Sequence, residues 1–323
     1  MGKPRVYVHR CGDMYGLYMD GENEASLGEF AEVADFGRVE TPAAPEQLVE
    51  EMSGADALLS LNGMHADEIT TGVLRAVGTV KVAVISHFWH GCHHVDWWEA
   101  AGVKVIDRSE ANSDAVAEWA LGCIIMGVRR LVRFNGLLKA GSPWGEPRRD
   151  AGIVCESVVG LVGLGRIGRV LARHLVGLGA DVIAYDAYVS EDEAVALGVR
   201  LVPLEELMRT ADVISLHLPV TDQTVGIIGR RELGLIKDGA VLVNSARALL
   251  LDWEALMDEL RTGRFQAFMD VYQVEPLPLD DPLRPMDNVF ITPHVAGDSA
   301  AMFRRCGRLA IEALREHFQG KAQ

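Results

Sequence analysis

The sequence predicts an α/β protein of two domains, each built on a parallel sheet covered by helices. From Val158 onward, short apolar runs rich in β-branched residues alternate with segments of helical length, which is the pattern of parallel strands joined by helices. The first hundred residues repeat this alternation more weakly, and 323 residues exceed one compact core of ordinary size. We therefore expect a larger domain and a second, smaller one.

The candidate strands are recognised by their Val and Ile content. In the larger domain they are Val158–Val162, Val182–Tyr185, Val199–Val202, Val213–His217, Ala240–Val243, Ala267–Met269 and Val289–Thr292. In the smaller domain they are Val6–His9, Ala57–Ser60, Val82–Ile85 and Val103–Ile106. The segment from Cys11 to Phe30 shows no clear period, and we expect a loop there.

Two segments of helical period connect the domains. Residues 112–139 predict one long helix, opened by Ser113 and Asp114 and closed by Gly141 and Pro143. Residues 297–318 place Leu309, Ile311 and Leu314 at helical spacing, with Gly320 beyond their end. We expect this last helix to return to the first domain.

Composition excludes several classes of protein. A net charge of −15 argues against a nucleic-acid partner, which needs clustered Lys and Arg. The most apolar long stretch, 115–128, is too short to span a bilayer and contains Glu118. The first residues show no apolar signal core and no cleavage site, so we expect no signal segment. The five cysteines lie far apart and form no Cys-x-x-Cys pair, so a disulfide framework or structural zinc is not expected. We predict a cytoplasmic protein without a membrane partner.

A glycine-rich loop carries the strongest functional signal. Gly163-Leu164-Gly165-Arg166-Ile167-Gly168 follows a predicted strand directly and opens a predicted helix, where its glycines permit a tight turn and close approach of a pyrophosphate. Asp186 ends the next strand, where a carboxylate can accept hydrogen bonds from the adenosine ribose. Asp186 also repels a 2′-phosphate, and Ala187-Tyr188 supplies no Arg to receive one. The loop predicts a Rossmann-type domain that binds NAD rather than NADP; the alternative is a glycine-rich turn beside a surface Asp.

Polar residues follow five predicted strands of the larger domain. Ligands of open parallel sheets bind in the crevice beyond the carboxyl ends of the strands. Those ends hold Asp186, His217-Leu218-Pro219, Asn244-Ser245-Ala246-Arg247, Asp270 and Thr292-Pro293-His294. We therefore expect a functional site at this edge of the sheet.

These motifs together resemble a known family, the D-isomer-specific 2-hydroxyacid dehydrogenases of the phosphoglycerate dehydrogenase-like type. The resemblance spans about residue 80 to the C-terminus. It rests on Gly163 to Gly168, His217-Leu218-Pro219 with Thr221 and Thr224, Ser245-Ala246-Arg247, Asp270-x-x-x-x-Glu275-Pro276-Leu277 and Pro293-His294-Val295-Ala296-Gly297.

The resemblance implies a Rossmann-type doubly wound parallel sheet inserted in a smaller flavodoxin-like α/β domain. The expected NAD-binding domain comprises residues 111–294, and the expected substrate domain comprises 1–110 and 295–323, with the active site in the cleft between them. Arg247 is implied as the substrate arginine, Glu275 as the partner of the catalytic histidine and His294 as the general acid/base. The implied cofactor-binding residues are Gly163, Gly165, Arg166, Ile167, Gly168, Asp186, His217, Pro219, Thr224, Ala246, Asp270 and Gly297. We also expect a homodimer.

The chemistry of a 2-keto acid fits the three catalytic assignments. A guanidinium offers forked donors that can orient the adjacent carboxylate and carbonyl. An imidazolium can protonate the carbonyl oxygen as hydride arrives, and a carboxylate can orient that imidazole. Formate-oxidising relatives carry glutamine at position 275, so Glu275 favours a hydroxy acid. The structural alternatives are a surface ion pair for Arg247, a turn histidine for His294 and a solvated carboxylate for Glu275.

The substrate loop departs from the family pattern. The usual Gly-x-Gly-x-Asp-Asn-x-Asp is replaced by Trp89-His90-Gly91-Cys92-His93-His94-Val95-Asp96. We assign substrate binding here to Asn62, Gly63, His90 and Gly91. A metal is not expected, since adjacent His93 and His94 cannot easily converge on one ion. One or two of these histidines could instead line the pocket and help to bind an anionic substrate; the alternative is packing, with Trp89, Trp97 and Trp98 covering the site or an interface.

The leading hypothesis is an NAD-dependent oxidoreductase that interconverts a 2-keto acid and a D-2-hydroxy acid by hydride transfer. Two alternatives stay open: an NAD-sensing binding protein like the corepressors that reuse this fold, and a dehydrogenase of a phosphonate or inorganic anion. The sequence leaves the identity of the hydroxy acid open.

Overall fold

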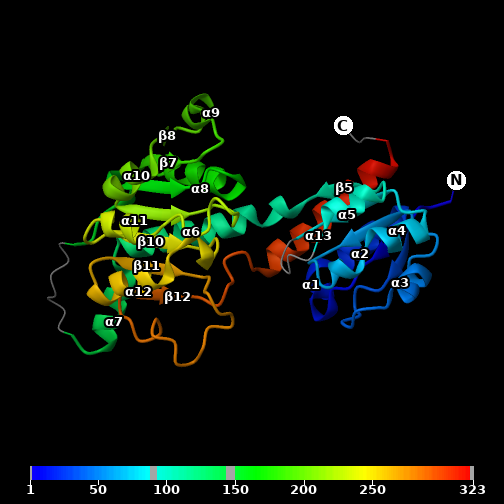
Figure 1. Cartoon of the computed structure of the whole chain (residues 1–323), viewed down its shortest axis with the longest axis horizontal. Helices are drawn as coiled ribbons and strands as arrows, with labels where there is room; N and C mark the ends of the chain where they lie inside the picture. Colours follow the sequence, from blue (N-terminus) through cyan, green and yellow to red (C-terminus); the bar gives the residue numbers. More distant parts are fainter. Residues whose placement is uncertain (1, 88–92, 143–149, 321–323) are drawn as a thin grey trace. The chain divides into compact units, whose positions relative to one another are not determined.

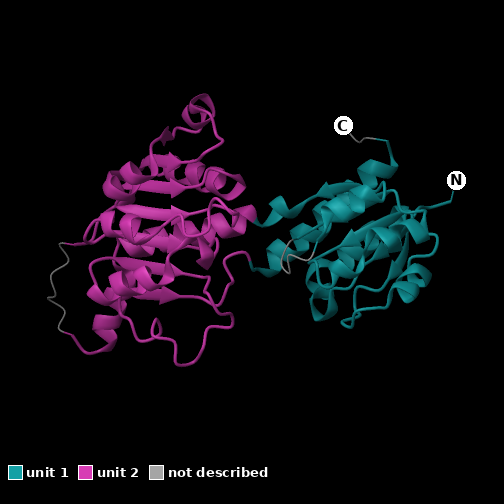
Figure 2. Ribbon diagram, in the orientation of Figure 1, with its two compact units in different colours: residues 1–112, 298–323 teal, residues 113–297 magenta. Residues whose placement is uncertain are grey.

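The computed structural model describes residues 2–87, 93–142 and 150–320, which divide into two compact units (Figures 1 and 2). Unit 1 contains residues 1–112 and 298–323, and unit 2 contains residues 113–297. The chain therefore enters unit 1, builds unit 2 and returns to unit 1. Unit 2 is an insertion in the sequence of unit 1.

In its described part, unit 1 has a five-stranded parallel sheet of order β2-β1-β3-β4-β5. Its strands are β1 (Arg5–Val8), β2 (Glu32–Asp35), β3 (Ala57–Ser60), β4 (Val82–Ile85) and β5 (Lys104–Asp107). Its helices are α1 (Tyr15–Tyr18), α2 (Gly21–Phe30), α3 (Pro45–Glu51), α4 (Thr71–Val77), α5 (Val95–Ala100) and α13 (Ala300–Phe318). This is the flavodoxin-like strand order.

Unit 2 has, among its described residues, a seven-stranded parallel sheet of order β12-β11-β10-β9-β6-β7-β8. Its strands are β6 (Val158–Val162), β7 (Asp181–Tyr185), β8 (Arg200–Leu201), β9 (Val213–Leu216), β10 (Val241–Asn244), β11 (Gln266–Met269) and β12 (Val289–Ile291). Its helices are α6 (Ser113–Val128), α7 (Leu131–Lys139), α8 (Arg166–Gly177), α9 (Glu191–Ala196), α10 (Leu204–Thr210), α11 (Arg230–Leu235) and α12 (Trp253–Thr262). The predicted doubly wound Rossmann-type fold is confirmed.

Helices cover both faces of the sheet in unit 2. Alternate residues of β10 point to opposite faces, so Leu242 packs in one apolar cluster while Val241 and Val243 pack in the other. Gly127 lets α6 approach the sheet closely, because a Cβ there would lie 2.7 Å from the Val241 side chain. The two buried clusters make the sheet a rigid platform for the loops at its carboxyl edge.

The predicted connecting helix is interrupted. α6 ends at Val128, and Arg130 adopts a left-handed conformation (φ 54°) before α7 begins. The Arg130 side chain donates hydrogen bonds to the carbonyl oxygens of Asp150 and Gly239. These contacts to distant segments hold the break, and the expectation of a single helix over 112–139 was wrong.

The segment expected to be a loop is largely helical. α1 and α2 occupy it, and the Asp20 side chain caps α2 by accepting a hydrogen bond from Asn23 N at 3.0 Å. Asn23 and Leu27 are the buried residues of α2, too few to give a clear apolar period. Strand β2 was also missed, because only Ala34 of its four residues is buried.

Helix α13 completes unit 1. Asn23 Nδ2 donates to Tyr18 O and to Arg304 O, which joins α2 to α13. Gly307 allows close packing, since a Cβ there would lie 2.0 Å from Tyr18 O. Residues 281 positions apart in the sequence are therefore in direct contact in unit 1. Within the described residues, no helix is both long and apolar enough to cross a membrane.

Candidate functional site

The glycine loop joins β6 to α8 at the point where the strand order of unit 2 reverses. Gly163 has φ 104°, and a Cβ there would lie 2.8 Å from the carbonyl carbon of His217. A Cβ on Gly168 would lie 2.3 Å from Gly163 O. Both positions therefore require glycine. Gly163 needs it for the positive φ and for the close contact with His217, and Gly168 needs it for the close contact between α8 and the loop.

The N-terminus of α8 suits an anion. Gly165 is the N-cap residue of α8, and because it has no side chain, no side-chain oxygen caps the helix. A Cβ at this position would meet no atom within 4 Å. Gly165 therefore leaves room for a pyrophosphate beside the start of α8, where the first N–H groups of a helix have no partner within the helix. Arg166 is exposed at the start of the helix, and Ile167 packs against the apolar core. These features fit a dinucleotide cofactor.

Asp186 follows β7 and connects two parts of this site. Its Oδ2 accepts a hydrogen bond from Leu164 N at 2.8 Å, and its Oδ1 accepts from Tyr188 N at 2.9 Å. A carboxylate has about four lone-pair sites, so Asp186 can still accept from a ribose hydroxyl. Its position beside the glycine loop is therefore compatible with adenosine binding.

His217 follows β9, next to the glycine loop. Its Nε2 lies 2.8 Å from Ser215 Oγ, and burial lowers the pKa of His217 to about 4. The imidazole is therefore neutral near pH 7. Thr224 Oγ1 donates to Pro219 O at 2.6 Å and so closes the loop that follows His217.

Arg247 is exposed in the turn after β10. Asn244 braces this turn, because its Oδ1 accepts from Ala246 N at 3.0 Å and its Nδ2 donates to Arg247 O at 3.1 Å. The guanidinium donates to Ala246 O at 2.7 Å and forms no salt bridge with any described residue. Its charge is therefore available to a ligand carboxylate.

Glu275 and His294 form a hydrogen-bonded pair. His294 Nδ1 lies 2.6 Å from Glu275 Oε2, and both side chains are more than a third exposed. Glu275 Oε1 accepts from Tyr272 N at 2.9 Å, which fixes the carboxylate from its other side. The pairing of Nδ1 leaves Nε2 as the nitrogen that can exchange a proton with a ligand.

Asp270 anchors the turn that carries His294. Its side chain is fully buried, and its oxygens accept hydrogen bonds from Thr292 Oγ1 (2.5 Å), Val295 N (2.9 Å) and Ala296 N (2.8 Å). His294 itself has φ 55°, a conformation that the flanking contacts of Asp270 help to hold. The structure thus gives Asp270 a positioning contact that the sequence did not indicate.

Two predicted catalytic residues, Arg247 and His294, and the predicted cofactor residue Asp270 follow neighbouring strands. Arg247 follows β10, Asp270 follows β11 and His294 follows β12, and these three strands pair in that order. Gly297 ends unit 2, beyond the same turn. Sequence patterns assigned no role to Tyr272, although it lies between two predicted site residues. Its hydroxyl lies within hydrogen-bond distance of both Met269 O (2.9 Å) and Thr292 O (2.7 Å), so its one proton can be shared between the ends of β11 and β12.

Residues assigned to the substrate loop lie in unit 1 or outside the described residues. Asn62 and Gly63 are buried in unit 1, whereas His90 and Gly91 lie outside the described residues. His93 packs edge-on against Trp98 at 5.6 Å, and His94 stacks on Trp97 at 3.8 Å. Among described residues, no group of three His, Cys, Asp or Glu could hold a metal.

Fold and site together define a nucleotide-binding α/β protein with an Arg, Glu and His at the carboxyl edge of its sheet. Residues 121–296 match the model of the D-isomer specific 2-hydroxyacid dehydrogenase NAD binding domain. This chain belongs to the D-isomer specific 2-hydroxyacid dehydrogenase family. The predicted family and the predicted cofactor, NAD, are confirmed.

Similar proteins extend this finding over the whole chain. Glyoxylate reductase of Korarchaeum cryptofilum is 32% identical over 319 residues, covering 97% of this chain and 92% of that protein. D-3-Phosphoglycerate dehydrogenase of Methanocaldococcus jannaschii is 32% identical over 309 residues, covering 94% of this chain but 57% of that protein. This chain thus spans little more than half the length of that relative. The crystal structure of TT0316 protein from Thermus thermophilus matches with a TM-score of 0.75 and 29% identity, covering 98% of this chain and 97% of that one.

Proposed function

We propose that this protein is an NAD-dependent oxidoreductase that interconverts a 2-keto acid and a D-2-hydroxy acid. The observation that carries the proposal is the 2.6 Å contact between His294 Nδ1 and Glu275 Oε2, two strands from the guanidinium of Arg247, which forms no salt bridge with a described residue. NAD supplies the hydride acceptor or donor when bound. The family to which the chain belongs supports the same activity.

Each residue has a distinct task in this reaction. Arg247 binds the substrate carboxylate through its forked N–H donors and orients the neighbouring carbonyl. His294 donates a proton from Nε2 to the carbonyl oxygen during reduction and accepts it during oxidation. Glu275 holds the ring by its Nδ1 and stabilises the protonated imidazole. Asp270 keeps the turn of His294 in place.

The test measures turnover and cofactor binding separately. Arg247→Ala and His294→Ala should each lose at least 100-fold in kcat/KM for 2-keto acids, a typical contribution of a general acid/base. Both variants should bind NADH with wild-type affinity in a fluorescence titration. Arg230→Ala removes an exposed arginine paired with Asp258 in the same unit and should keep full activity. Unchanged turnover in both site variants would sink the assignment.

We propose that unit 1 is the substrate domain.

We also propose that the protein is a homodimer. Helix α7 supports the dimer, because it has no buried residue although it contains several apolar side chains. Leu131 and Leu138 are 47% and 54% exposed. A second copy of the chain would cover this apolar surface. The double substitution Leu131→Glu and Leu138→Glu should convert the dimer to a monomer in analytical ultracentrifugation. An unchanged sedimentation coefficient would contradict this role of α7 in the proposed dimer.

We further propose a cytoplasmic location. The cysteines that the structure describes, Cys11, Cys123, Cys155 and Cys306, are all free thiols, as expected in a reducing compartment. Fractionation of producing cells tests this directly, and recovery of the protein outside the cytoplasm would refute it.

A further inference from the structure

Tyr272 is linked to both members of the hydrogen-bonded pair Glu275 and His294. It lies shortly after Asp270 in the segment that follows β11, and it is only 7% exposed. Its backbone N–H group is linked to one member of the pair, and its hydroxyl group is linked to the other. Every residue except proline could supply the N–H group, whereas the hydroxyl group depends on the side chain. The side chain can therefore be changed without removing the backbone contact.

The first link runs through Glu275. Tyr272 N donates to Glu275 Oε1 at 2.9 Å, and the other oxygen of the same carboxylate, Oε2, lies 2.6 Å from His294 Nδ1. A carboxylate only accepts hydrogen bonds, so the proton of this contact belongs to Nδ1. The side chain of His294 is 44% exposed and that of Glu275 is 36% exposed, so packing alone does not fix the ring. Its orientation depends on the hydrogen bonds around it.

The second link runs through the carbonyl group of Thr292. Tyr272 Oη lies 2.7 Å from Thr292 O, closer than the 2.9 Å to Met269 O. Thr292 O also accepts from His294 N at 3.1 Å, and a carbonyl oxygen has two lone pairs, so both donors can bind it together. Burial, followed by the charge of Asp270, raises the pKa of Tyr272, so the hydroxyl group keeps its proton and donates it. One oxygen thus receives the Tyr272 hydroxyl group and the His294 backbone.

The backbone of His294 needs such support. Its φ of 55° is in the left-handed region, which a residue with a side chain adopts only where its surroundings hold it. After His294, the Asp270 carboxylate accepts from the next two backbone N–H groups. Before His294, Asp270 holds the hydroxyl group of Thr292, and Tyr272 holds the carbonyl group of the same residue. The turn is therefore held from both sides, and Tyr272 supplies part of the contact on one side.

We propose that Tyr272 is a positioning residue, whose hydroxyl group fixes the Thr292 carbonyl and thereby keeps the His294 ring aligned with Glu275. Without the hydroxyl group, the Thr292 peptide can rotate and carry His294 Nδ1 away from the carboxylate. The ring then loses the contact that selects its tautomer, and Nε2 is no longer held ready to exchange a proton. The inference rests on the proposed function, which makes His294 the acid/base. Tyr272 acts through His294 and takes no part in the proton transfer itself.

The tautomer of His294 gives a test that does not depend on turnover. Tyr272→Phe removes the hydroxyl group and keeps the N–H contact to Glu275. A long-range proton–nitrogen NMR spectrum of the full-length protein, labelled at histidine, separates protonated from bare ring nitrogens; the His294 signals are those missing in His294→Ala. At a pH where the ring is neutral, we expect the wild-type proton on Nδ1 alone and a mixture of tautomers in Tyr272→Phe. Unchanged His294 signals in the variant would overturn the inference, and a mixture in the wild-type protein would overturn it without any variant.

Kinetics connect the tautomer to the reaction. We expect Tyr272→Phe to lower kcat for 2-keto acids roughly 3- to 10-fold, the range for one hydrogen bond, and to bind NADH with wild-type affinity. A wild-type kcat together with a changed tautomer would contradict the proposed function, and the inference with it. Unchanged His294 signals would overturn the inference alone, because the activity of the wild-type protein does not depend on that result.

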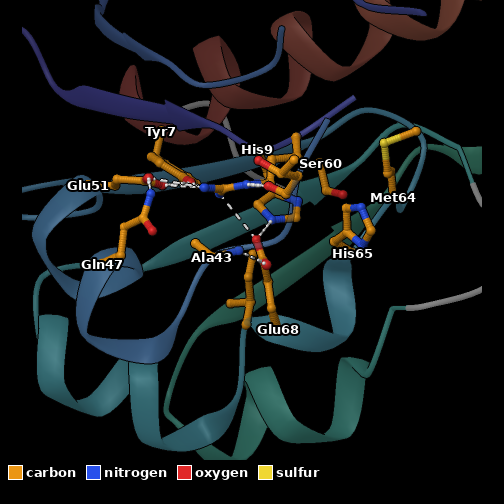
Figure 3. A network of polar contacts seen from close by, with 12 residues as sticks. Tyr7, His9, Ala43, Gln47, Glu51, Ser60, Met64, His65 and Glu68 are labelled. Carbon is orange, nitrogen blue, oxygen red and sulfur yellow. Dashed lines mark hydrogen bonds and ion pairs between the residues drawn. The ribbon is translucent and has the colours of Figure 1, made fainter. Parts of the chain in front are cut away.

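Tyr7→Phe is the matched control for a general loss of stability. Tyr7 is fully buried in unit 1, where its hydroxyl group donates to Glu51 Oε2 at 2.9 Å and accepts from Arg10 at 2.9 Å (Figure 3). Loss of these contacts to charged groups should lower the urea midpoint. The variant should nevertheless keep the wild-type His294 signals and the wild-type kcat. If Tyr7→Phe and Tyr272→Phe change the His294 signals equally, the effect is a loss of stability, and the positioning role is refuted.

Discussion

Asp270 links the stability of unit 2 to the position of its proposed acid/base. The Asp270→Asn substitution keeps the shape of the side chain but replaces one oxygen by an amide nitrogen that cannot accept a hydrogen bond. If the remaining oxygen keeps the hydrogen bonds from Thr292 Oγ1 and Val295 N, the new amide nitrogen faces the N–H group of Ala296. In the wild-type protein Ala296 N lies 2.8 Å from the oxygen that this nitrogen replaces. Two donors then oppose each other in a fully buried site.

The cost follows from these contacts. Loss of one hydrogen bond to a charged acceptor costs about 1.5–3 kcal/mol, and an unpaired buried N–H adds about 1–3 kcal/mol. We therefore expect the free energy of unfolding to fall by roughly 3–5 kcal/mol. Since Val295 and Ala296 directly follow His294, we also expect kcat to fall at least roughly tenfold through misplacement of the imidazole.

Urea unfolding of the full chain, followed by circular dichroism, measures the first effect, and steady-state NADH oxidation measures the second. The matched control is Asp287→Asn, which removes the same charge from an exposed position in unit 2 and should change stability by less than about 0.5 kcal/mol. Asp270→Asn protein that unfolds at the same urea concentration as Asp287→Asn, with unchanged kcat, would refute the reasoning.

Three further predictions concern other parts of the two units. Gly163→Ala should weaken NADH binding at least roughly tenfold in a fluorescence titration, because its Cβ would lie 2.8 Å from the His217 backbone; wild-type affinity would contradict the role of the loop. The pKa of His217 is about 4 in the folded protein and near 6.5 when unfolded, so the unfolded chain binds the proton first and stability falls as pH drops from 6.5 towards 4. His217→Gln should flatten that part of a plot of Tm against pH, and an unaltered slope would count against the burial effect. Gly63→Ala should displace the His93 ring and lower the free energy of unfolding by about 1–3 kcal/mol, whereas a wild-type urea midpoint would show that the site has spare room.

The predicted strands of unit 2 agree with the structure to within one or two residues at their ends. Buried parallel strands have a strong local signal, because both faces demand apolar residues over four or five positions. Edge strand β2 and short helix α2 escaped detection because they bury few side chains. Sequence patterns of a few residues record local burial and say little about elements held mainly by their neighbours.

The candidate site shows the same division. The glycine loop and Asp186 could be found from sequence, since the spacing itself carries the chemistry. The left-handed conformations of Arg130 and His294 could not, because each depends on hydrogen bonds across 20 or more positions, from Arg130 to Asp150 and from Asp270 to the turn of His294. Nor does sequence show that the buried Nδ2 of Asn62 has no hydrogen-bond partner among the described residues, which is a property of packing.

The position of α13 in unit 1 has a consequence for biosynthesis. A ribosome that has finished residue 112 must still add the 185 residues of unit 2, from 113 to 297, before α13 emerges. At 5–20 residues per second this takes about 10 to 40 s. During that interval the surface around Tyr18 and Asn23, which Arg304 and Gly307 later cover, is exposed to chaperones and proteases. Unit 2 has all its strands before then, so the inserted unit can fold before the unit that surrounds it in sequence.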